Sequence, residues 1–198
     1  QTNSAYAVAK IAGLELIRAY RKQYNRKWIS LMPTNLYGPR DNFNLESSHV
    51  LPALINRYVT AKRAGSSDVT LWGTGNPLRE FLHVDDLARA IVLTAEKYDS
   101  NLHLNIGTGK DLTIKELAER VAIAAGFKGE IEWDPSKPDG QPRRIARRID
   151  RADAALGKAV RHEDDARDVD RAGDELLRRA VDDPDGLEDD GLFMIKEC

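Results

Sequence analysis

The order of apolar and polar positions along the chain predicts four helices. Between residues 4 and 24, apolar side chains recur every three or four positions, the spacing of a helix with one buried face. Gly13 lies inside this helix, where its small size suggests close packing against another element. In the last of the helices, Thr113 and Glu116 have the spacing of a capping box. The other three helical patterns cover residues 50–64, 84–98 and 112–126.

Short apolar runs between the helices predict strands. Residues 33–44 follow the first run and are rich in turn formers, which predicts a loop at the carboxyl end of a strand. His83, Asp85 and Asp86 stand at a strand-to-helix junction, so we assign them to the fold. Strands that alternate with helices predict an α/β fold with parallel pairing. The predicted strands are residues 28–32, 69–72, 79–82, 102–106 and 130–133.

Composition and charge narrow the class of protein. The chain carries 30 lysines and arginines against 32 aspartates and glutamates, so a net charge of −2 gives no general attraction to nucleic acid or to an anionic membrane. Its single cysteine, Cys198, allows no internal disulfide and no cysteine cluster for a metal. No apolar run reaches the length of about 20 residues that a membrane span needs, and a cytoplasmic setting fits best. Residues 145–198 are dominated by charged side chains, which predicts a disordered or loosely helical tail.

Tyr6 and Lys10 form the first candidate for chemistry. Residues four apart on a helix share one face, so the lysine ammonium is expected close to the phenol. A nearby cation stabilises phenolate, which makes the tyrosine a usable proton donor and acceptor. A tyrosine and a lysine at this spacing also occur in many helices as an ordinary solvated pair, so the spacing by itself leaves both interpretations open.

Five sequence blocks follow this helix and carry a resemblance. They are MPTNLYGPRDNF, SSHVLPAL, LWGTGNPLREFLHVDD, NIGTG and SKPDGQPR. In this order they resemble the extended short-chain dehydrogenase/reductases that act on nucleotide-sugars, and most closely the GDP-L-fucose synthase family. The resemblance implies the last part of a Rossmann-type dinucleotide-binding domain at residues 1–48 and a mainly substrate-binding α/β region at 49–144. Residues 145–198 depart from the family, and a shifted reading frame is our hypothesis for them.

The resemblance also implies an activity. Members convert GDP-4-keto-6-deoxy-D-mannose to GDP-L-fucose by epimerisation at two ring carbons followed by reduction with NADPH. The implied cofactor is therefore NADP(H), the implied partner a GDP-sugar, and the implied assembly a homodimer. The family's glycine-rich dinucleotide turn precedes its catalytic tyrosine, and the sequence begins too close to Tyr6 to contain it. We therefore expect this chain to be the second half of such an enzyme and to be inactive alone.

By the same resemblance, residues can be assigned to the cofactor and to proton transfer. Tyr6 matches the proton donor for the ketone, and Lys10 matches the residue that tunes it and holds the nicotinamide ribose. His49 matches the general acid of epimerisation and borders the cofactor; its partner in the family is a cysteine that Cys198 does not replace. A lone histidine before a helix is otherwise a cap or a surface residue. The loop that lines the nicotinamide, otherwise a plain turn after a strand, matches Pro33, Thr34, Asn35 and Leu36.

Four further residues match the family's substrate contacts. Arg57 and Arg79 suit a diphosphate because guanidinium forks bind it through two hydrogen bonds. Trp72 offers an apolar wall, and Asp139 lies in the loop that touches the guanine nucleotide. The alternatives are a solvated helix face for Arg57, an ion pair with Glu80 for Arg79, a core aromatic for Trp72 and an ordinary turn for Asp139.

Two other functions remain open at this point. The chain could belong to another NAD(P)-dependent nucleotide-sugar epimerase or dehydratase, which would share Tyr6 and Lys10 but lack the surroundings of His49. It could also be a non-catalytic module that binds a nucleotide-sugar. Binding of GDP without binding of NADPH would favour that second alternative.

Overall fold

The computed structural model of this chain describes residues 4–45, 47–139 and 143–144, so the predicted tail at 145–198 lies outside the described part. No described helix combines the length and the apolar character needed to cross a bilayer. The elements run in the order α1 (Ser4–Tyr24), β1 (Leu31–Pro33), β2 (Asn35–Tyr37), α2 (Val50–Ala64), β3 (Asp68–Trp72), β4 (Leu78–His83), α3 (Val84–Lys97), β5 (Leu104–Ile106), β6 (Asp111–Thr113), α4 (Ile114–Ala125), β7 (Glu130–Asp134) and β8 (Arg143–Arg144).

Helix ends follow the local sequence closely. The Thr113 hydroxyl accepts a hydrogen bond from the Glu116 N–H at 3.0 Å, and the Glu116 carboxylate accepts one from the Thr113 N–H at 2.7 Å. The predicted capping box of α4 is therefore confirmed. Gly126 ends α4 and Gly65 ends α2, both with a positive φ that glycine adopts at little cost. The predicted helix over residues 50–64 has the same bounds as α2.

The strands pair mainly in parallel, as predicted for an α/β fold. β1 pairs with β5, β2 with β4, β3 with β7 and β8 with β4, all in parallel, while β6 lies antiparallel to β4. The prediction is wrong at residues 28–30, which precede β1, and it missed β2 and β6. Those two strands have three residues each, so pairing with β4 rather than local sequence defines them.

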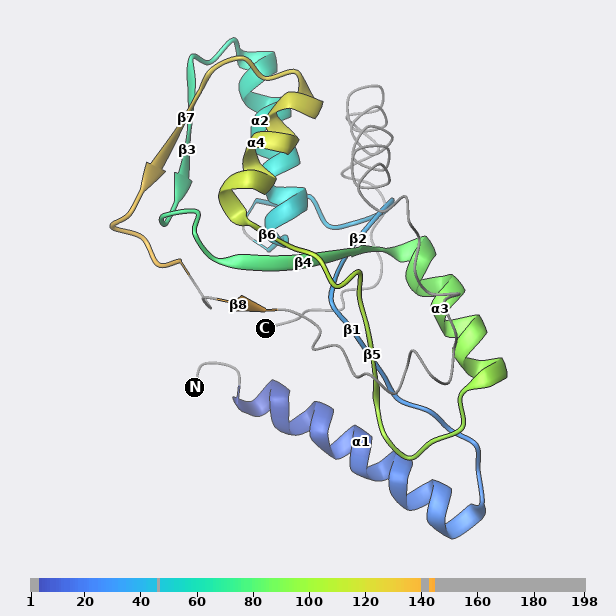
Figure 1. Cartoon of the computed structure of the whole chain (residues 1–198). Coiled ribbons are helices and arrows are strands. Elements are labelled where there is room, and N and C mark those ends of the chain that lie inside the picture. Colours follow the sequence, from blue (N-terminus) through green and yellow to red (C-terminus); the bar gives the residue numbers. More distant parts are fainter. Residues whose placement is uncertain (1–3, 46, 140–142, 145–198) are drawn as a thin grey trace.

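Two hydrophobic cores hold the elements together (Figure 1). The first core packs α2 and α4 against each other and against β3 and β7, with Tyr58, Leu54 and Leu117 among its buried residues. The second core is smaller and consists of Leu82, Ala90, Leu104 and Ile106. β4 passes between the two, since Phe81 belongs to the first core and Leu82 to the second. The division into a cofactor and a substrate region at residue 48 stays a prediction.

Helix α1 lies along the lower edge of Figure 1 and is joined to the rest near its carboxyl end. The Arg21 guanidinium donates a hydrogen bond to the Trp28 carbonyl at 2.7 Å and forms an ion pair with Asp99. The predicted buried face of this helix is wrong within the described chain, because α1 has no buried residue and most of its apolar side chains are exposed. A Cβ at Gly13 would meet nothing within 4 Å among the described residues, so the close packing predicted there is absent.

Candidate functional site

Tyr6 and Lys10 lie in the first half of α1 and face each other. The Lys10 ammonium is 5.2 Å from the centroid of the Tyr6 ring, within the range of a cation–π contact. Tyr6 is half-buried and Lys10 is exposed. A phenol with a cation beside it, reachable from solvent, has the components of a proton donor whose anion is stabilised after transfer. The assignment of Tyr6 as the catalytic acid stays a prediction.

The loop predicted at Pro33–Leu36 is wrong in part, because Pro33 ends β1 and Asn35 and Leu36 begin β2, so the chain crosses from one strand pair to another at Thr34. The Thr34 hydroxyl and the Asn35 amide both donate to the Glu80 carbonyl, at 2.9 and 2.7 Å. The loop leads into β2 rather than into a helix, so the alternative of a plain strand-to-helix turn is wrong. It lies at the carboxyl end of parallel strand β1, where open α/β sheets bind ligands.

His49 is the N-cap residue of α2, but its imidazole does not cap the helix. Its backbone is extended, with φ −73° and ψ 168°, and its side chain makes no capping hydrogen bond. The side chain is exposed, which leaves it available for a ligand. Asp41 lies close enough for the charge on His49 to affect its carboxyl. Burial raises the pKa of Asp41, whereas the hydrogen bond from the Asn42 N–H and the charge on His49 lower that pKa.

Trp72 and Asp139 come together at the carboxyl end of β3. The Trp72 side chain is 62% exposed, so the alternative of a core aromatic is wrong. The Lys137 ammonium lies 5.7 Å from the centroid of its ring. The Asp139 carboxylate accepts hydrogen bonds from the Thr74 N–H at 2.5 Å and the Thr74 hydroxyl at 2.7 Å. These bonds, with one from the Gly75 N–H, hold the pKa of Asp139 below its ordinary value.

The geometry at Asp139 joins two loops. Gly73 has φ +84°, and a side chain there would collide with the Asp139 carboxylate. Asp139 therefore fastens the KPDG loop to the turn after β3, next to the exposed Trp72. An apolar ring, an ammonium and a loop held in place form a surface suited to a base or sugar.

The two predicted substrate arginines have partners within the fold. The Arg57 guanidinium on α2 donates to the Thr70 carbonyl on β3 at 3.1 Å, so it is not simply a solvated side chain. Arg79 on β4 donates to the Leu78 carbonyl at 2.9 Å. Both side chains are half-buried. Their contacts with a substrate stay predictions.

The structure therefore groups the predicted residues into local sets. The first is the pair on α1, the second the loop after β1, and the third the surface at the end of β3. His83 does accept a hydrogen bond from the Asp85 N–H at 3.3 Å, which confirms the assignment of that junction to the fold.

Comparison with known proteins defines the family. The sequence matches the NAD dependent epimerase/dehydratase family over residues 1–107. This chain belongs to the NAD-dependent epimerase/dehydratase family. The α/β architecture with mostly parallel pairing agrees with the Rossmann-like fold of such proteins.

Within this epimerase/dehydratase family, the sequence is similar to proteins named GDP-L-fucose synthase. It is 56% identical over 144 residues to GDP-L-fucose synthase 1 of Arabidopsis thaliana and 50% identical over 153 residues to GDP-L-fucose synthase of Escherichia coli. Each alignment covers 73% of this chain but only 45% and 48% of those proteins. The chain thus spans about half the length of the curated relatives it matches.

A solved structure of an epimerase/dehydratase relative has a similar fold. The chain superimposes on the GDP-L-fucose synthetase from Naegleria fowleri, solved bound to NADP, with a TM-score of 0.80 and 30% identity. The superposition covers 92% of this chain and 57% of that one.

The donor set formed by Tyr6, Lys10 and the Pro33–Leu36 segment fits one end of a nicotinamide dinucleotide. The Lys10 ammonium and the Tyr6 hydroxyl can hydrogen-bond to ribose hydroxyls, and both can be reached from solvent. Pro33 is exposed at the end of β1, and the Thr34 and Asn35 side chains are held by Glu80, so this loop offers backbone and apolar surface to a flat ring. These residues suit the nicotinamide ribose.

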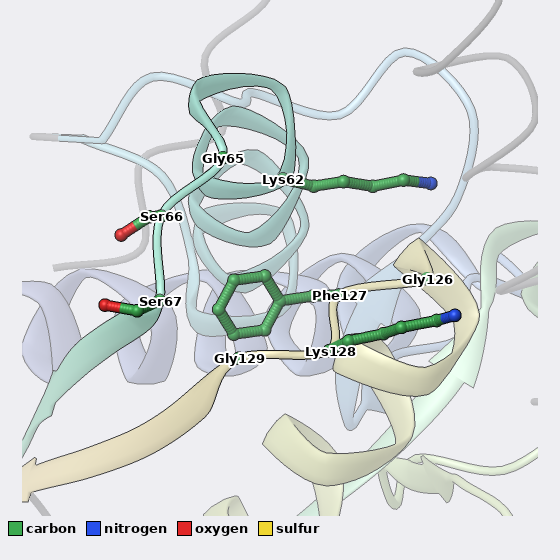
Figure 2. Close-up of a pocket in the computed structure, with 8 residues that line it drawn as sticks. All are labelled: Lys62, Gly65, Ser66, Ser67, Gly126, Phe127, Lys128 and Gly129. Atoms are coloured by element: carbon green, nitrogen blue, oxygen red, sulfur yellow. The ribbon is translucent and has the colours of Figure 1, made fainter.

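A surface cavity of about 510 Å³ lies elsewhere, between the carboxyl ends of α2 and α4 (Figure 2). Figure 2 shows Ser66 and Ser67 on one side of Phe127, while Lys62 and Lys128 extend the other way, so their polar ends do not converge. Lys62 donates to the Ala125 carbonyl at 2.9 Å, and the Ser66 hydroxyl donates to the Asp68 carbonyl. Its polar groups therefore serve helix ends and loops, and none of the predicted site residues lines it.

Sequence reasoning missed four residues next to the site. Glu80 holds the loop after β1, Thr74 and Lys137 shape the surface beside Trp72, and Asp41 lies near His49. Glu80 gave a detectable signal, because an acidic residue inside a predicted strand next to Phe81 and Leu82 is buried only if it is hydrogen-bonded. The others gave none, since their role depends on loops distant in sequence.

Proposed function

We propose that this chain carries the proton-donating and substrate-binding part of an NADP(H)-dependent epimerase-reductase. The proposed reaction converts GDP-4-keto-6-deoxy-D-mannose to GDP-L-fucose. The observation that carries it is the Lys10 ammonium 5.2 Å from the Tyr6 ring on an accessible helix. Similarity to GDP-L-fucose synthases over 144 residues supports the choice of substrate. The homodimer implied by the resemblance and the cytoplasmic setting indicated by the single cysteine are part of the proposal.

In the proposed reduction, Tyr6 gives its hydroxyl proton to the ketone oxygen at C4 of the sugar. The nicotinamide cofactor, when bound, supplies the hydride that reaches the same carbonyl carbon. Lys10 stabilises the phenolate that remains on Tyr6, which then regains a proton from solvent. The loop at Pro33–Leu36 would hold the nicotinamide ring by its backbone and apolar surface.

In the proposed epimerisation at C3 and C5, a base takes a proton from the ring carbon and His49 delivers one to the same carbon from the opposite face. The resemblance gives the role of that base to a cysteine that Cys198 does not replace. The exposed imidazole of His49, not used as a helix cap, is suited to its role. Trp72, Asp139 and the two arginines would bind the GDP moiety, the tryptophan by its exposed face and the arginines through the diphosphate.

Variants of Tyr6 and His49 test these roles in an enzyme that joins residues 1–144 to the amino-terminal part of the Arabidopsis relative. We expect Tyr6→Phe to lower reduction at least about 100-fold, because general acid catalysis contributes at least that much. Tyr24→Phe, an exposed tyrosine on the same helix, is the matched control and should have little effect. Undiminished reduction by Tyr6→Phe would refute the role of Tyr6.

His49→Gln separates this proposal from other nucleotide-sugar enzymes. We expect epimerisation to fall about 100-fold or more while reduction of a pre-epimerised ketone survives. Equal loss of both activities would contradict the role given to His49. Reduction serves as the internal control, since it uses the same fold and cofactor.

A non-catalytic nucleotide-sugar module is the second candidate function. It is favoured by the surface around Trp72, which is assembled from β3 and the KPDG loop with no contribution from α1. The enzyme that joins residues 1–144 to the amino-terminal part of the Arabidopsis relative distinguishes the candidates. GDP binding without turnover favours the module, whereas turnover that Tyr6→Phe lowers favours the catalytic proposal.

A further inference from the structure

Glu80 is a carboxylate buried at the centre of the strands that carry the site. It lies in β4, between β2 and β6, and is 1% exposed. A buried charge is costly unless hydrogen bonds satisfy it. Such a residue is retained in a core when its hydrogen bonds hold something in place.

The Glu80 side chain binds the loop that follows β5. Its carboxylate accepts the Gly109 N–H at 2.6 Å and the Thr108 hydroxyl at 3.4 Å. Gly109 has φ +74°, so this loop adopts a conformation that presents its N–H to the carboxylate. A charged acceptor makes such a bond shorter and stronger than a neutral one.

The Glu80 backbone binds the loop that follows β1. Its carbonyl oxygen accepts from both the Thr34 hydroxyl and the Asn35 amide. The Thr34 N–H still donates to the Ile106 carbonyl at 3.0 Å, whereas Asn35 already pairs with β4. The chain therefore changes partner strand at Thr34, and Glu80 lies at that change.

One residue thus joins two loops at the carboxyl ends of neighbouring parallel strands, β1 and β5. We propose that Glu80 is a positioning residue, whose buried carboxylate fixes the 107–110 loop and whose carbonyl fixes the Pro33–Leu36 loop against it. That Pro33–Leu36 receives a nicotinamide ring rests on the proposed function. The positioning itself rests on the hydrogen bonds of Glu80. Glu80 acts through these two loops.

Hydrogen exchange on the chain itself tests this with four variants. Glu80→Met removes the side-chain acceptor at similar size, Glu80→Gln keeps an oxygen acceptor, Thr34→Val removes a donor to the Glu80 carbonyl, and Glu132→Gln changes an exposed glutamate on β7 as the matched control. We expect Glu80→Met to speed exchange about 10- to 100-fold in residues 107–111, the range set by loss of a charge-assisted hydrogen bond. Thr34→Val should instead speed exchange in residues 33–37. Glu80→Gln should restore part of the protection at 107–111, and Glu132→Gln should change neither segment.

Three outcomes would overturn the proposal. The first is unchanged exchange at 33–37 in Thr34→Val, which would show that the Glu80 carbonyl does not hold that segment. The second is an equal rise in α4, which would make Glu80 a general core residue. The third is a glutamine variant no better protected than the methionine variant.

A titration with NADPH, followed by amide NMR signals, keeps this proposal separate from the proposed function. In the enzyme that joins residues 1–144 to the amino-terminal part of the Arabidopsis relative, we expect NADPH to shift the signals of residues 33–36. If NADPH binds to that enzyme and shifts none of these signals, the assignment of residues 33–36 to the cofactor fails. The exchange data then still decide whether Glu80 positions the two loops.

Discussion

Tyr58 on α2 is a buried side chain that makes the stability of the fold depend on pH. Its side chain is fully buried, and its hydroxyl has no hydrogen-bond partner among the described residues. Burial, and then the charge of Glu119, raise the pKa of Tyr58 to about 12, against the opposing effect of Arg57. A tyrosine in the unfolded chain ionises near pH 10, so it loses its proton first.

We expect this difference to weaken the fold at alkaline pH. Between pH 10 and 12 the folded state keeps the proton and the unfolded state does not, so stability falls as pH rises through this window. Relative to Tyr58→Phe, the wild-type chain should lose on the order of 2 kcal/mol across it. Urea denaturation at each pH measures this, with exposed Tyr24→Phe as control. If the free energy of unfolding falls equally with pH in wild type and in Tyr58→Phe, this expectation is contradicted.

The sequence predicts the contacts and the exposure of some residues better than those of others. Thr113 and Glu116 were predicted because a capping box involves neighbours in sequence. Trp72 left two alternatives, since a strand pattern does not say whether its outer face is covered, and the structure leaves it exposed. The hydrogen bonds of Glu80 join residues up to 46 positions apart, and no local pattern predicts them.

At the scale of elements, local signals set helix ends and tertiary pairing sets the short strands. α2 and α4 end at glycines in the left-handed region, which a sequence reveals. β2 and β6 have three residues each and exist through their pairing with β4. The apolar spacing of α1 correctly predicted a helix but not its surroundings, because periodicity shows a face without showing what covers it.

Helix α1 depends on polar contacts near its carboxyl end. We expect Arg21→Ala to speed hydrogen exchange in α1 about 3- to 10-fold, because it removes hydrogen bonds to Trp28 and Asp99 that are partly screened by solvent. Lys22→Ala, its exposed neighbour, is the matched control. Exchange in α4 should stay the same in both variants. No difference between Arg21→Ala and Lys22→Ala would show that the helix is held by other contacts.

This prediction bears on the proposed chemistry. Tyr6 and Lys10 lie about three to four turns from Arg21, so the orientation of the pair depends on a helix joined to the rest at its far end. Loosening the carboxyl end of α1 should affect the proposed proton transfer from Tyr6 before it affects the proposed binding of GDP at Trp72. The surface around Trp72 is held instead by β3, β7 and Asp139.

At the scale of the whole molecule, the two cores differ in size and share β4. The first core buries residues of α2, α4 and β3, with Ile131 and Trp133 of β7 packed against them, whereas the buried residues of the second are Leu82, Ala90, Leu104 and Ile106. Burial of apolar surface is the main stabilising contribution, so the second core should open at a lower free energy than the first. We therefore expect β1, β5 and α3 to exchange faster than α2 and α4 in the wild-type chain.

Matched truncations test whether the cores are separate cooperative units. Leu104 and Leu117 are both 2% exposed, and truncation of a buried leucine to alanine costs about 2–5 kcal/mol. Leu104→Ala should speed exchange in β1, β5 and α3 and leave α2 and α4 protected, because it removes contacts from the second core alone. Leu117→Ala should instead lower the urea concentration at which α2 and α4 lose half of their protection from hydrogen exchange. If either variant speeds exchange equally everywhere, β4 couples the two cores into one cooperative unit. The segment Pro33–Leu36 would then open together with the surface around Trp72 rather than independently of it.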